Sequence, residues 1–391
     1  MPKSEPSAAK SRLLVVTTDV AAVEERLAGE PEYPRQDFRE LADALDARIV
    51  SFSDLRRGCG WLTHCIERVF GRGSALAWFA FRQKADFYFT TAENAGYPLA
   101  FLLKFRPAAR HVMIAHRISA AKKRLIACRL RLFRRVDQMI CYSHTQSDFA
   151  RDQFGVPDER CHRIDFQVDA QFYTPGDTQT PGTGVVSVGR ELRDYPTLFE
   201  AVRDTDIPVT VVASSPWSKR ADQTRNRNIP QNVTLRKGLS YCELRDLYRT
   251  CALVVVPLQD VDSPAGITSI LEAQAVGKPV IVTKSPGIVD SIEPGKTVVT
   301  VPPSDPNALR AAIQRLLASP DEAANIAKRG HAAALEGKTL DHYIERIRHI
   351  CQPSPASRCP HSSPPASPQP VPRGPKCDAD GPVRHPKTPP H

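Results

Sequence analysis

The sequence predicts an α/β protein built from two doubly wound domains with parallel sheets. Short apolar runs, typical of buried parallel strands, alternate with helical patterns along most of the chain. The length of 391 residues exceeds what one ordinary domain needs. Residues 174–184 are rich in turn formers and divide the alternation into two halves. We therefore expect a first domain at 1–172, a linker at 173–184, a second domain at 185–338, a closing helix at 339–352 and a tail at 353–391.

The first half opens with an apolar strand pattern at residues 13–18. Phe38, Leu41, Ala42 and Leu45 then recur at the spacing of an amphipathic helix. A long helical region is expected at 55–84. Further strands are expected at 48–52, 87–91, 111–115 and 138–142.

The second half repeats this alternation. Asp305 and Pro306 form an N-cap with proline at the first helical position, and a last helix is expected at 340–350. Ligands of such sheets bind beyond the carboxyl ends of the strands, so the site is expected there. Neither Gly-x-Gly-x-x-Gly nor a P-loop motif follows a strand, which argues against dehydrogenases and P-loop enzymes. The strands are expected at 185–188, 209–212, 233–235, 252–256, 280–282 and 297–301.

The tail at 353–391 contains 13 prolines and almost no large apolar residues, so we expect it to be disordered. None of the ten cysteines forms a Cys-x-x-Cys pair, which favours reduced thiols in a cytoplasmic protein. No apolar run reaches the length of a membrane span, and the first residues lack a secretion signal. The expected location is cytoplasmic, with a peripheral position at the inner face of the membrane as an extension of that expectation.

The formal net charge of +10 is concentrated in two places, the tail and residues 117–135. The second segment interleaves apolar residues with cations, which is typical of an interfacial helix on an anionic membrane surface. A merely solvated charged face is the equal alternative. No zinc-ligand spacing, aromatic RNA-binding signature or helix-turn-helix pattern is present, so no nucleic acid is expected as a partner. The cations are Arg117, Lys122, Lys123, Arg124, Arg129, Arg131, Arg134 and Arg135, and the apolar residues are Ile118, Leu125, Ile126, Leu130 and Phe133.

Residues 257–283 contain the most informative motif. A strand ends there, and a turn of small residues opens a helix at Gly266, Ile267, Thr268 and Ser269. The free amides at a helix start favour a phosphate. Glu272 follows one turn into the helix, where it could reach a ribose. Ser269 and Glu272 also fit a capping box, in which both side chains merely satisfy the helix N-terminus.

This stretch resembles the donor-binding signature of retaining glycosyltransferases of family 4, the glycosyl transferases group 1. The resemblance covers residues 13–350 and is strongest at 185–302. It implies the GT-B fold, in which two Rossmann-like domains face each other across a cleft. Residues 186–201 look like the family's strand-turn-helix, in which an arginine and a lysine grip the donor diphosphate. Residues 166–175 are similar to the stretch that precedes the family's interdomain linker.

The resemblance implies transfer of a sugar from a nucleotide-diphosphate sugar with retention of configuration and without a metal or other cofactor. It places Gly189, Arg190 and, instead of the lysine, Arg193 at the diphosphate, and it places His116 at the transferred sugar. Positive groups fixed there would stabilise the charge of the departing diphosphate. The implied catalytic residues are Arg190, Arg193 and His116, and the implied donor-binding residues are Glu272, Gly266, Ile267, Thr268, Ser269 and Gly189. The acceptor is unidentified, and a lipid-linked acceptor is one option.

One departure from the family pattern concerns recognition of the sugar. Pro264 occupies the position of the family's first glutamate, so this recognition would fall to Asp262, Ser263 or the backbone of 265–268. Two other functions stay open: a GT-B scaffold that binds a nucleotide without turnover, and a metal-dependent glycosyltransferase using Asp260 and Asp262. A nucleic-acid-binding protein is a third class, favoured only by the basic segment.

Single residues have simpler explanations as well. Arg190 and Arg193 could pair with Glu191 and Asp194 on the surface, where such pairs contribute little to stability. His116 could be a hydrogen-bonded structural histidine.

Overall fold

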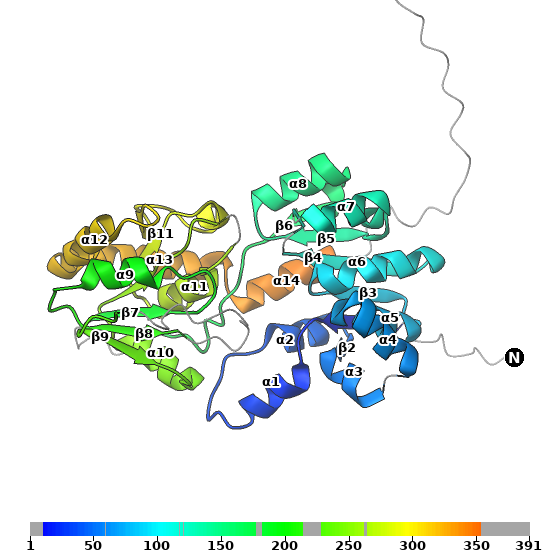
Figure 1. The fold of residues 1–391 in the computed structure, drawn as a ribbon, viewed down its shortest axis with the longest axis horizontal. Helices are drawn as coiled ribbons and strands as arrows, with labels where there is room; N and C mark the ends of the chain where they lie inside the picture. Colours follow the sequence, from blue (N-terminus) through cyan, green and yellow to red (C-terminus); the bar gives the residue numbers. More distant parts are fainter. Residues whose placement is uncertain are drawn as a thin grey trace, which may run out of the picture. The chain divides into compact units, whose positions relative to one another are not determined.

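A computed structural model describes residues 11–58, 60–116, 118–119, 121–176, 182–213, 228–261 and 264–352. The expectations for the tail at 353–391, for Arg117, and for Asp262 and Ser263 lie outside these residues. The predicted α/β class is confirmed: the described chain folds into two six-stranded parallel sheets with helices on both faces of each (Figure 1).

The first sheet has the strand order β2-β1-β3-β4-β5-β6, and all its pairs are parallel. Its central strands are buried on both faces, as expected from their uninterrupted apolar runs. Strand β6 was not predicted, because its three residues form no apolar run: Cys161 and His162 are half-buried, and Arg163 is exposed. The strands are β1 (Arg12–Val16), β2 (Arg48–Ser51), β3 (Phe87–Thr90), β4 (Arg110–Ala115), β5 (Gln138–Cys141) and β6 (Cys161–Arg163).

The helical region predicted at 55–84 is divided among three helices. Gly60 caps the second of them, and Gly71, with a φ of 86°, separates the second from the third. The helices of this half are α1 (Val20–Leu27), α2 (Asp37–Ala44), α3 (Phe52–Gly58), α4 (Trp61–Phe70), α5 (Arg72–Arg82), α6 (Glu93–Leu102), η1 (Leu103–Phe105), α7 (Ala121–Arg129), η2 (Leu132–Arg135), α8 (His144–Phe154) and η3 (Asp158–Arg160).

The second sheet has the order β12-β11-β10-β7-β8-β9 and is also parallel. Its strands are β7 (Val185–Val188), β8 (Val209–Val212), β9 (Val233–Arg236), β10 (Leu253–Val256), β11 (Val280–Thr283) and β12 (Val299–Val301). Strand β12 is shorter than predicted, because Val298 bridges back to Pro294 across a turn at Gly295. The helices are α9 (Tyr195–Val202), α10 (Tyr241–Thr250), α11 (Ile267–Ala275), η4 (Pro286–Ser291), α12 (Pro306–Ala318), α13 (Pro320–Gly337) and α14 (Leu340–Ile350).

The last helix, α14, packs on the first sheet although it ends the described chain. Leu340, Tyr343 and Ile347 join the core that α1 and α2 form over that sheet. The hydroxyl of Tyr343 lies 2.9 Å from that of Tyr142, and both are buried. Residues from the beginning and the end of the described chain therefore share one core.

The basic segment is not one continuous amphipathic stripe. Ile118 is fully buried, and Phe133 is half-buried and stacks on Phe154 with ring centroids 5.4 Å apart. These two residues belong to the core rather than to a surface, which corrects the predicted pattern. Within the described ranges, no helix combines the length and the apolar character that crossing a membrane requires.

Candidate functional site

The carboxyl ends of β7 and β10 meet beside two glycines with positive φ. Gly189 follows β7 with a φ of 111°, and Gly266 caps α11 with a φ of 82°. A Cβ on Gly189 would lie 2.3 Å from Nη2 of Arg193, and a Cβ on Gly266 would lie 2.9 Å from Cγ1 of Val256. Only glycine fits these two positions, which lets the chain turn closely around the side chain of Arg193.

Arg193 connects the end of β7 to the first turn of α11. Its Nε donates to the carbonyl of Val188 at 3.0 Å, and Nη1 donates to the carbonyl of Glu191 at 3.0 Å. Nη2 donates to Oγ of Ser269 at 3.1 Å. The residue is 4% exposed, and this burial lowers its pKa from the ordinary value. The alternative of a surface ion pair is therefore wrong for Arg193.

Arg190 is different, because it is half-buried and has no hydrogen bond or ion pair with another described residue. Its Nε is buried without a hydrogen-bond partner. A buried donor of this kind is costly unless a ligand or water satisfies it. Arg190 is therefore the described arginine at this edge that is most available to an anion.

Helix α11 begins without a side-chain cap, because Gly266 occupies the N-cap. Ser269 donates its hydroxyl hydrogen to the carbonyl of Val188 at 3.4 Å, besides accepting from Arg193. The capping box considered for Ser269 and Glu272 is therefore wrong. The first amides of α11 are left to bind an anion, as the positive end of a helix favours.

Glu272 points toward two tyrosines rather than toward the helix end. The hydroxyl of Tyr248 donates to its Oε2 at 3.0 Å, and Tyr173 also forms a side-chain hydrogen bond with it. Burial raises the pKa of Glu272 to about 7, while the two tyrosine bonds and the charge of Arg193 act in the opposite direction. The carboxyl group can thus change its charge near neutral pH.

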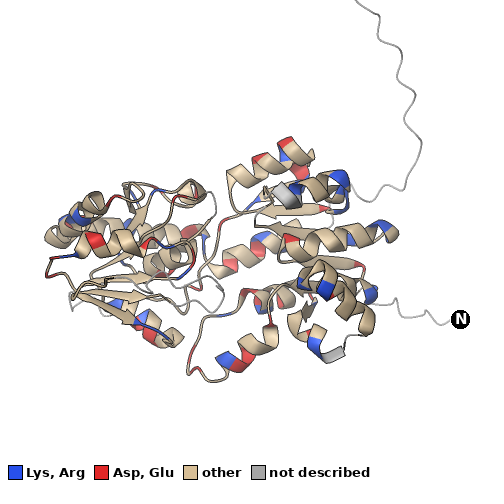
Figure 2. Cartoon of the chain, viewed as in Figure 1, with Lys and Arg blue, Asp and Glu red and all other residues tan. Residues whose placement is uncertain are grey.

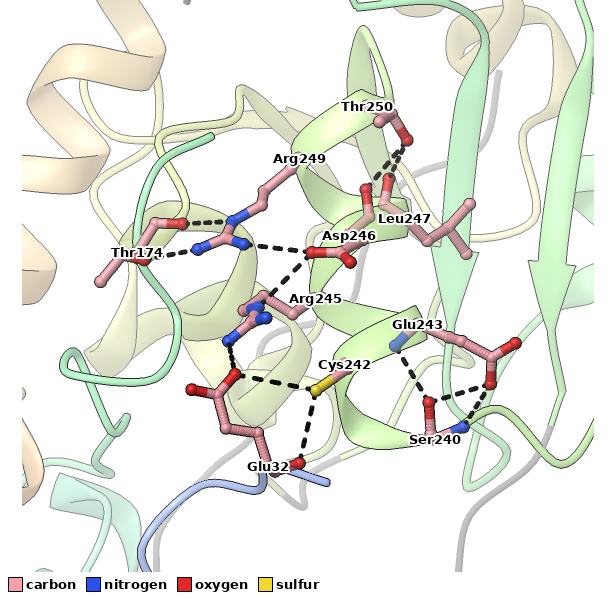
Figure 3. Close-up of polar contacts among 10 residues, drawn as sticks. All are labelled: Glu32, Thr174, Ser240, Cys242, Glu243, Arg245, Asp246, Leu247, Arg249 and Thr250. Atoms are coloured by element: carbon pink, nitrogen blue, oxygen red, sulfur yellow. Dashed lines mark hydrogen bonds and ion pairs between the residues drawn. The ribbon is translucent and has the colours of Figure 1, made fainter. Parts of the chain in front are cut away.

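Helix α10 holds Tyr248 in place and is anchored at several points along its length (Figure 3). Ser240 and Glu243 form a true capping box at its start. Arg245 donates to the carboxylate of Glu32 at 2.7 Å, and Arg249 donates to the carbonyl of Thr174 at 2.9 Å. Glu32 precedes α2, so a loop of the first half is bound to the helix that presents Tyr248.

Two cavities adjoin these residues, and Asp37 lines both. The smaller, of about 140 Å³, is lined among others by Thr268, Glu272 and Tyr173. The larger, of about 260 Å³, is lined among others by His116 and by residues at the ends of β1 and β4. The structure thereby connects Glu272 and His116, predicted from distant parts of the sequence, through Asp37.

Sequence reasoning missed Asp37. It is the first residue of α2, and its Oδ1 accepts from the amide of Phe38 at 2.7 Å. Its Oδ2 accepts from Nε2 of Gln167 at 3.3 Å. Burial raises its pKa above the ordinary value. The available signal was an acidic residue opening the amphipathic helix that the sequence pattern predicts.

His116 directly follows β4 and is held at both its backbone and its ring. Its amide donates to Oε2 of Glu93 at 3.0 Å, and Nε2 lies 2.9 Å from the carbonyl of Thr91. A carbonyl oxygen only accepts, so Nε2 carries a hydrogen and donates it to Thr91. The residue is thus a hydrogen-bonded histidine that also lines the larger cavity.

The residues considered for a metal are not brought together in the described part of the chain. Asp260 is exposed, and Asp262 lies outside the described residues. No group of three or more His, Cys, Asp or Glu side chains in the described ranges is arranged to hold a metal ion. Pro264, at the position of the missing glutamate, is half-buried.

Comparisons with known proteins find similar sequences over part of the chain. Residues 185–333 match the family model of glycosyl transferases group 1. The D-inositol 3-phosphate glycosyltransferase of Nocardiopsis dassonvillei is 22% identical over 251 residues, which are 57% of this chain and 58% of that protein. The MMP alpha-(1->4)-mannosyltransferase of Mycolicibacterium hassiacum is 24% identical over 217 residues, 53% of this chain and 51% of that protein. The chain thus spans about half the length of the curated relatives it matches.

Solved structures show the same fold over most of the chain. The sucrose-phosphate synthase of Thermosynechococcus elongatus aligns with a TM-score of 0.66 at 17% identity, covering 87% of this chain and 98% of that one. HepE of Anabaena, solved in complex with UDP-glucose, aligns with a TM-score of 0.64 at 17% identity, covering 86% and 98%. Together with the two parallel sheets, these neighbours show that the chain has the GT-B fold.

Proposed function

We propose that this protein transfers a sugar from a nucleotide-diphosphate sugar to an acceptor hydroxyl. The observation that carries the proposal is the uncapped start of α11, with Glu272 one turn later on the smaller cavity, inside the segment that matches glycosyl transferases group 1. The UDP-glucose complex of the similarly folded HepE supports a nucleotide-sugar donor.

In this proposal, the donor diphosphate binds at the ends of β7 and β10. Arg190 supplies a free guanidinium, and the first amides of α11 supply dipoles aimed at the same charge. Arg193 fixes these two elements to each other, and any direct contact of Arg193 with the diphosphate stays a prediction. Glu272 accepts from the ribose hydroxyls. These groups stabilise the negative charge that develops as the diphosphate leaves.

We further propose retention of the anomeric configuration without a metal ion. In such a reaction the departing phosphate oxygen takes the proton of the acceptor hydroxyl on the same face of the sugar. The carbon–oxygen bond to the diphosphate breaks as the bond to the acceptor oxygen forms. The arginine and the helix amides then supply the charge stabilisation that a metal would otherwise supply.

The larger cavity is the proposed place of the acceptor, next to His116 and Asp37. A cytoplasmic location, a lipid-linked acceptor and contact with an anionic membrane through residues 117–135 stay predictions of the sequence. The metal-dependent alternative has no support from the described residues, because Asp260 is exposed and belongs to no group of side chains there that could hold a metal ion.

A thermal-shift screen tests the proposal, because a ligand that binds only the native state raises the melting temperature. The full chain is screened against UDP, GDP, ADP and their sugar conjugates, with and without EDTA. We expect stabilisation by one nucleotide that EDTA does not abolish. Stabilisation only in the presence of a divalent metal would contradict metal independence, and no shift with any nucleotide would contradict the donor site. Nucleotide binding without product formation for any acceptor would identify a non-catalytic scaffold.

A further inference from the structure

Large hydrophobic side chains are exposed unevenly over the described part of the chain. Most of those that are exposed lie between Trp61 and Leu130, on helices that cover one face of the first sheet. Phe105 is 73% exposed, Leu125 is 68% exposed and Ile126 is 55% exposed. Where such side chains gather into one patch, they mark an interaction site.

Contacts in the structure bring several of these side chains onto one surface. Nζ of Lys104 in η1 donates to the carbonyl of Leu130 at 2.6 Å, which attaches η1 to the end of α7. The rings of Phe101 and Phe105 pack edge to face, with centroids 6.3 Å apart. We call this the η1–α7 surface, and its exposed hydrophobic residues are Phe101, Phe105, Leu125, Ile126 and Leu130.

Cations surround the η1–α7 surface. Arg124, Arg129, Arg131 and Arg134 are exposed, and no described acidic side chain forms an ion pair with any of them. Figure 2 shows Lys and Arg on α7, and η1, which directly follows α6, adds Lys104. A cavity of about 470 Å³ beside α7 is lined among others by Arg131, Arg134 and Arg160.

Not every arginine of this region is available to a partner. Arg160 donates to the carbonyls of Asp137, Phe133 and Val136. Arg135 likewise donates to carbonyls of the loop that follows η1. These two side chains hold the fold together. The side chains of Arg131 and Arg134 form no hydrogen bond or ion pair with another described residue, so their charges are free to meet an external anion.

We propose that the η1–α7 surface docks on an anionic lipid bilayer. Phe105, Leu125, Ile126 and Leu130 would enter the interfacial layer, while the free arginines contact lipid phosphates. Hydrophobic side chains rimmed by cations match such a surface in both chemistry and charge. The η1–α7 surface thus includes η1, which lies outside the basic segment. It excludes Ile118 and Phe133, which are core residues.

The proposal is tested by co-sedimentation of the full chain with vesicles. Vesicles of phosphatidylcholine are compared with vesicles that contain about 30 mol% phosphatidylglycerol. We expect binding to the anionic vesicles only, weakened by added salt. The double variant Arg131→Ala/Arg134→Ala should bind about 10- to 30-fold more weakly. The double variant Phe105→Ser/Ile126→Ser should lose about tenfold or more.

The matched control is Leu335→Ser/Lys328→Ala, which removes one exposed hydrophobic residue and one exposed cation from α13. This control should bind like the unmodified chain, and circular dichroism should confirm that all variants are folded. Equal binding to neutral vesicles, or unchanged binding of both surface variants, would overturn the proposal. The protein could also bind oligonucleotides and no vesicles, with the arginine variant losing that binding. This outcome would overturn the proposal in favour of a nucleic-acid surface. The assay does not depend on transfer activity.

Discussion

Tyr248 donates a hydrogen bond to the carboxylate of Glu272 over 3.0 Å, and Glu272 lines the smaller cavity. This contact keeps a buried carboxyl group oriented before any donor arrives. It also means that the charge of Glu272 is under the control of its neighbours, because burial raises its pKa to about 7 and the tyrosine bonds resist that rise.

Glu272→Gln should weaken nucleotide-sugar binding about tenfold, because an amide is a poorer acceptor for ribose hydroxyls than a carboxylate. Donor affinity of the unmodified chain should rise between about pH 6 and pH 8, as the carboxyl group loses its proton. The variant should show no such rise. Isothermal titration over this range checks both expectations, and Glu293→Gln, an exposed glutamate of the same half, is the control.

The free energy of unfolding should change with pH in the direction opposite to donor affinity, because of the same residue, Glu272. The pKa of Glu272 is higher in the folded than in the unfolded protein, so the proton on its carboxyl group stabilises the fold. This contribution to the free energy of unfolding is fully present below about pH 4.5 and is lost as the pH rises toward 7. Between these limits the loss is about 3 kcal/mol. Urea unfolding should therefore show that Glu272→Gln gains stability relative to the unmodified chain at pH 8 and not at pH 5. An equal difference at both pH values would contradict the buried position.

Arg190→Ala and Arg193→Ala should separate two roles that the sequence treats alike. Arg193 makes three buried hydrogen bonds, so its loss should cost about 3 kcal/mol of stability besides slowing transfer. Arg190 has no described partner, so its loss should leave the melting temperature nearly unchanged and slow transfer about 100-fold. Melting curves and initial rates on both variants check this. Equal destabilisation of the two variants would contradict the assignment.

Asp37→Asn should reduce transfer about tenfold or more, because the side chain lines the cavity proposed for the acceptor beside His116. Donor binding should change far less, because the proposed donor contacts come from Arg190, the start of α11 and Glu272. The substitution preserves shape and the hydrogen bond to the amide of Phe38. Donor titration and rates at several acceptor concentrations measure the two effects. Asp43→Asn, an exposed position of the same helix, should change neither.

Asp169 and Asp341 both bind the guanidinium of Arg35, and their substitutions should differ strongly in cost. Asp169 has a side chain that is 3% exposed and accepts from the amide and the side chain of Arg35. Asp341 is 59% exposed. Asp169→Ala should lower the free energy of unfolding by about 3 kcal/mol, and Asp341→Ala by less than about 1 kcal/mol. Chemical denaturation of the two variants measures both losses of unfolding free energy, and losses of similar size would contradict the prediction.

Much of the fold could be predicted from the sequence, because buried parallel strands consist of short runs of consecutive apolar residues. The strands around Leu14 and Val254 are recognisable for that reason. Strand β6 could not be, since pairing with β5 rather than its own composition makes it a strand. The start of α11 was placed correctly from a local glycine turn.

The surroundings of the candidate site could not be predicted, because they come from contacts far apart in the sequence. Tyr173 and Tyr248 reach Glu272 from other elements, and nothing in the local pattern indicates them. Asp37 lies more than 200 residues before Glu272, yet one cavity includes both. Family resemblance found the residues of the motif and missed those that set their charge.

The packing of α14 decides how this protein can be divided for study. A fragment that stops before residue 339 would leave the first sheet without Leu340, Tyr343 and Ile347, exposing apolar surface to aggregation. The amide of Leu340 donates to the carbonyl of Val168, and the amide of Val168 donates to the carbonyl of Lys338, each at 2.9 Å. A fragment of the first half should therefore end after residue 168 and carry residues 338–352 attached through a short linker, so that both hydrogen bonds can form.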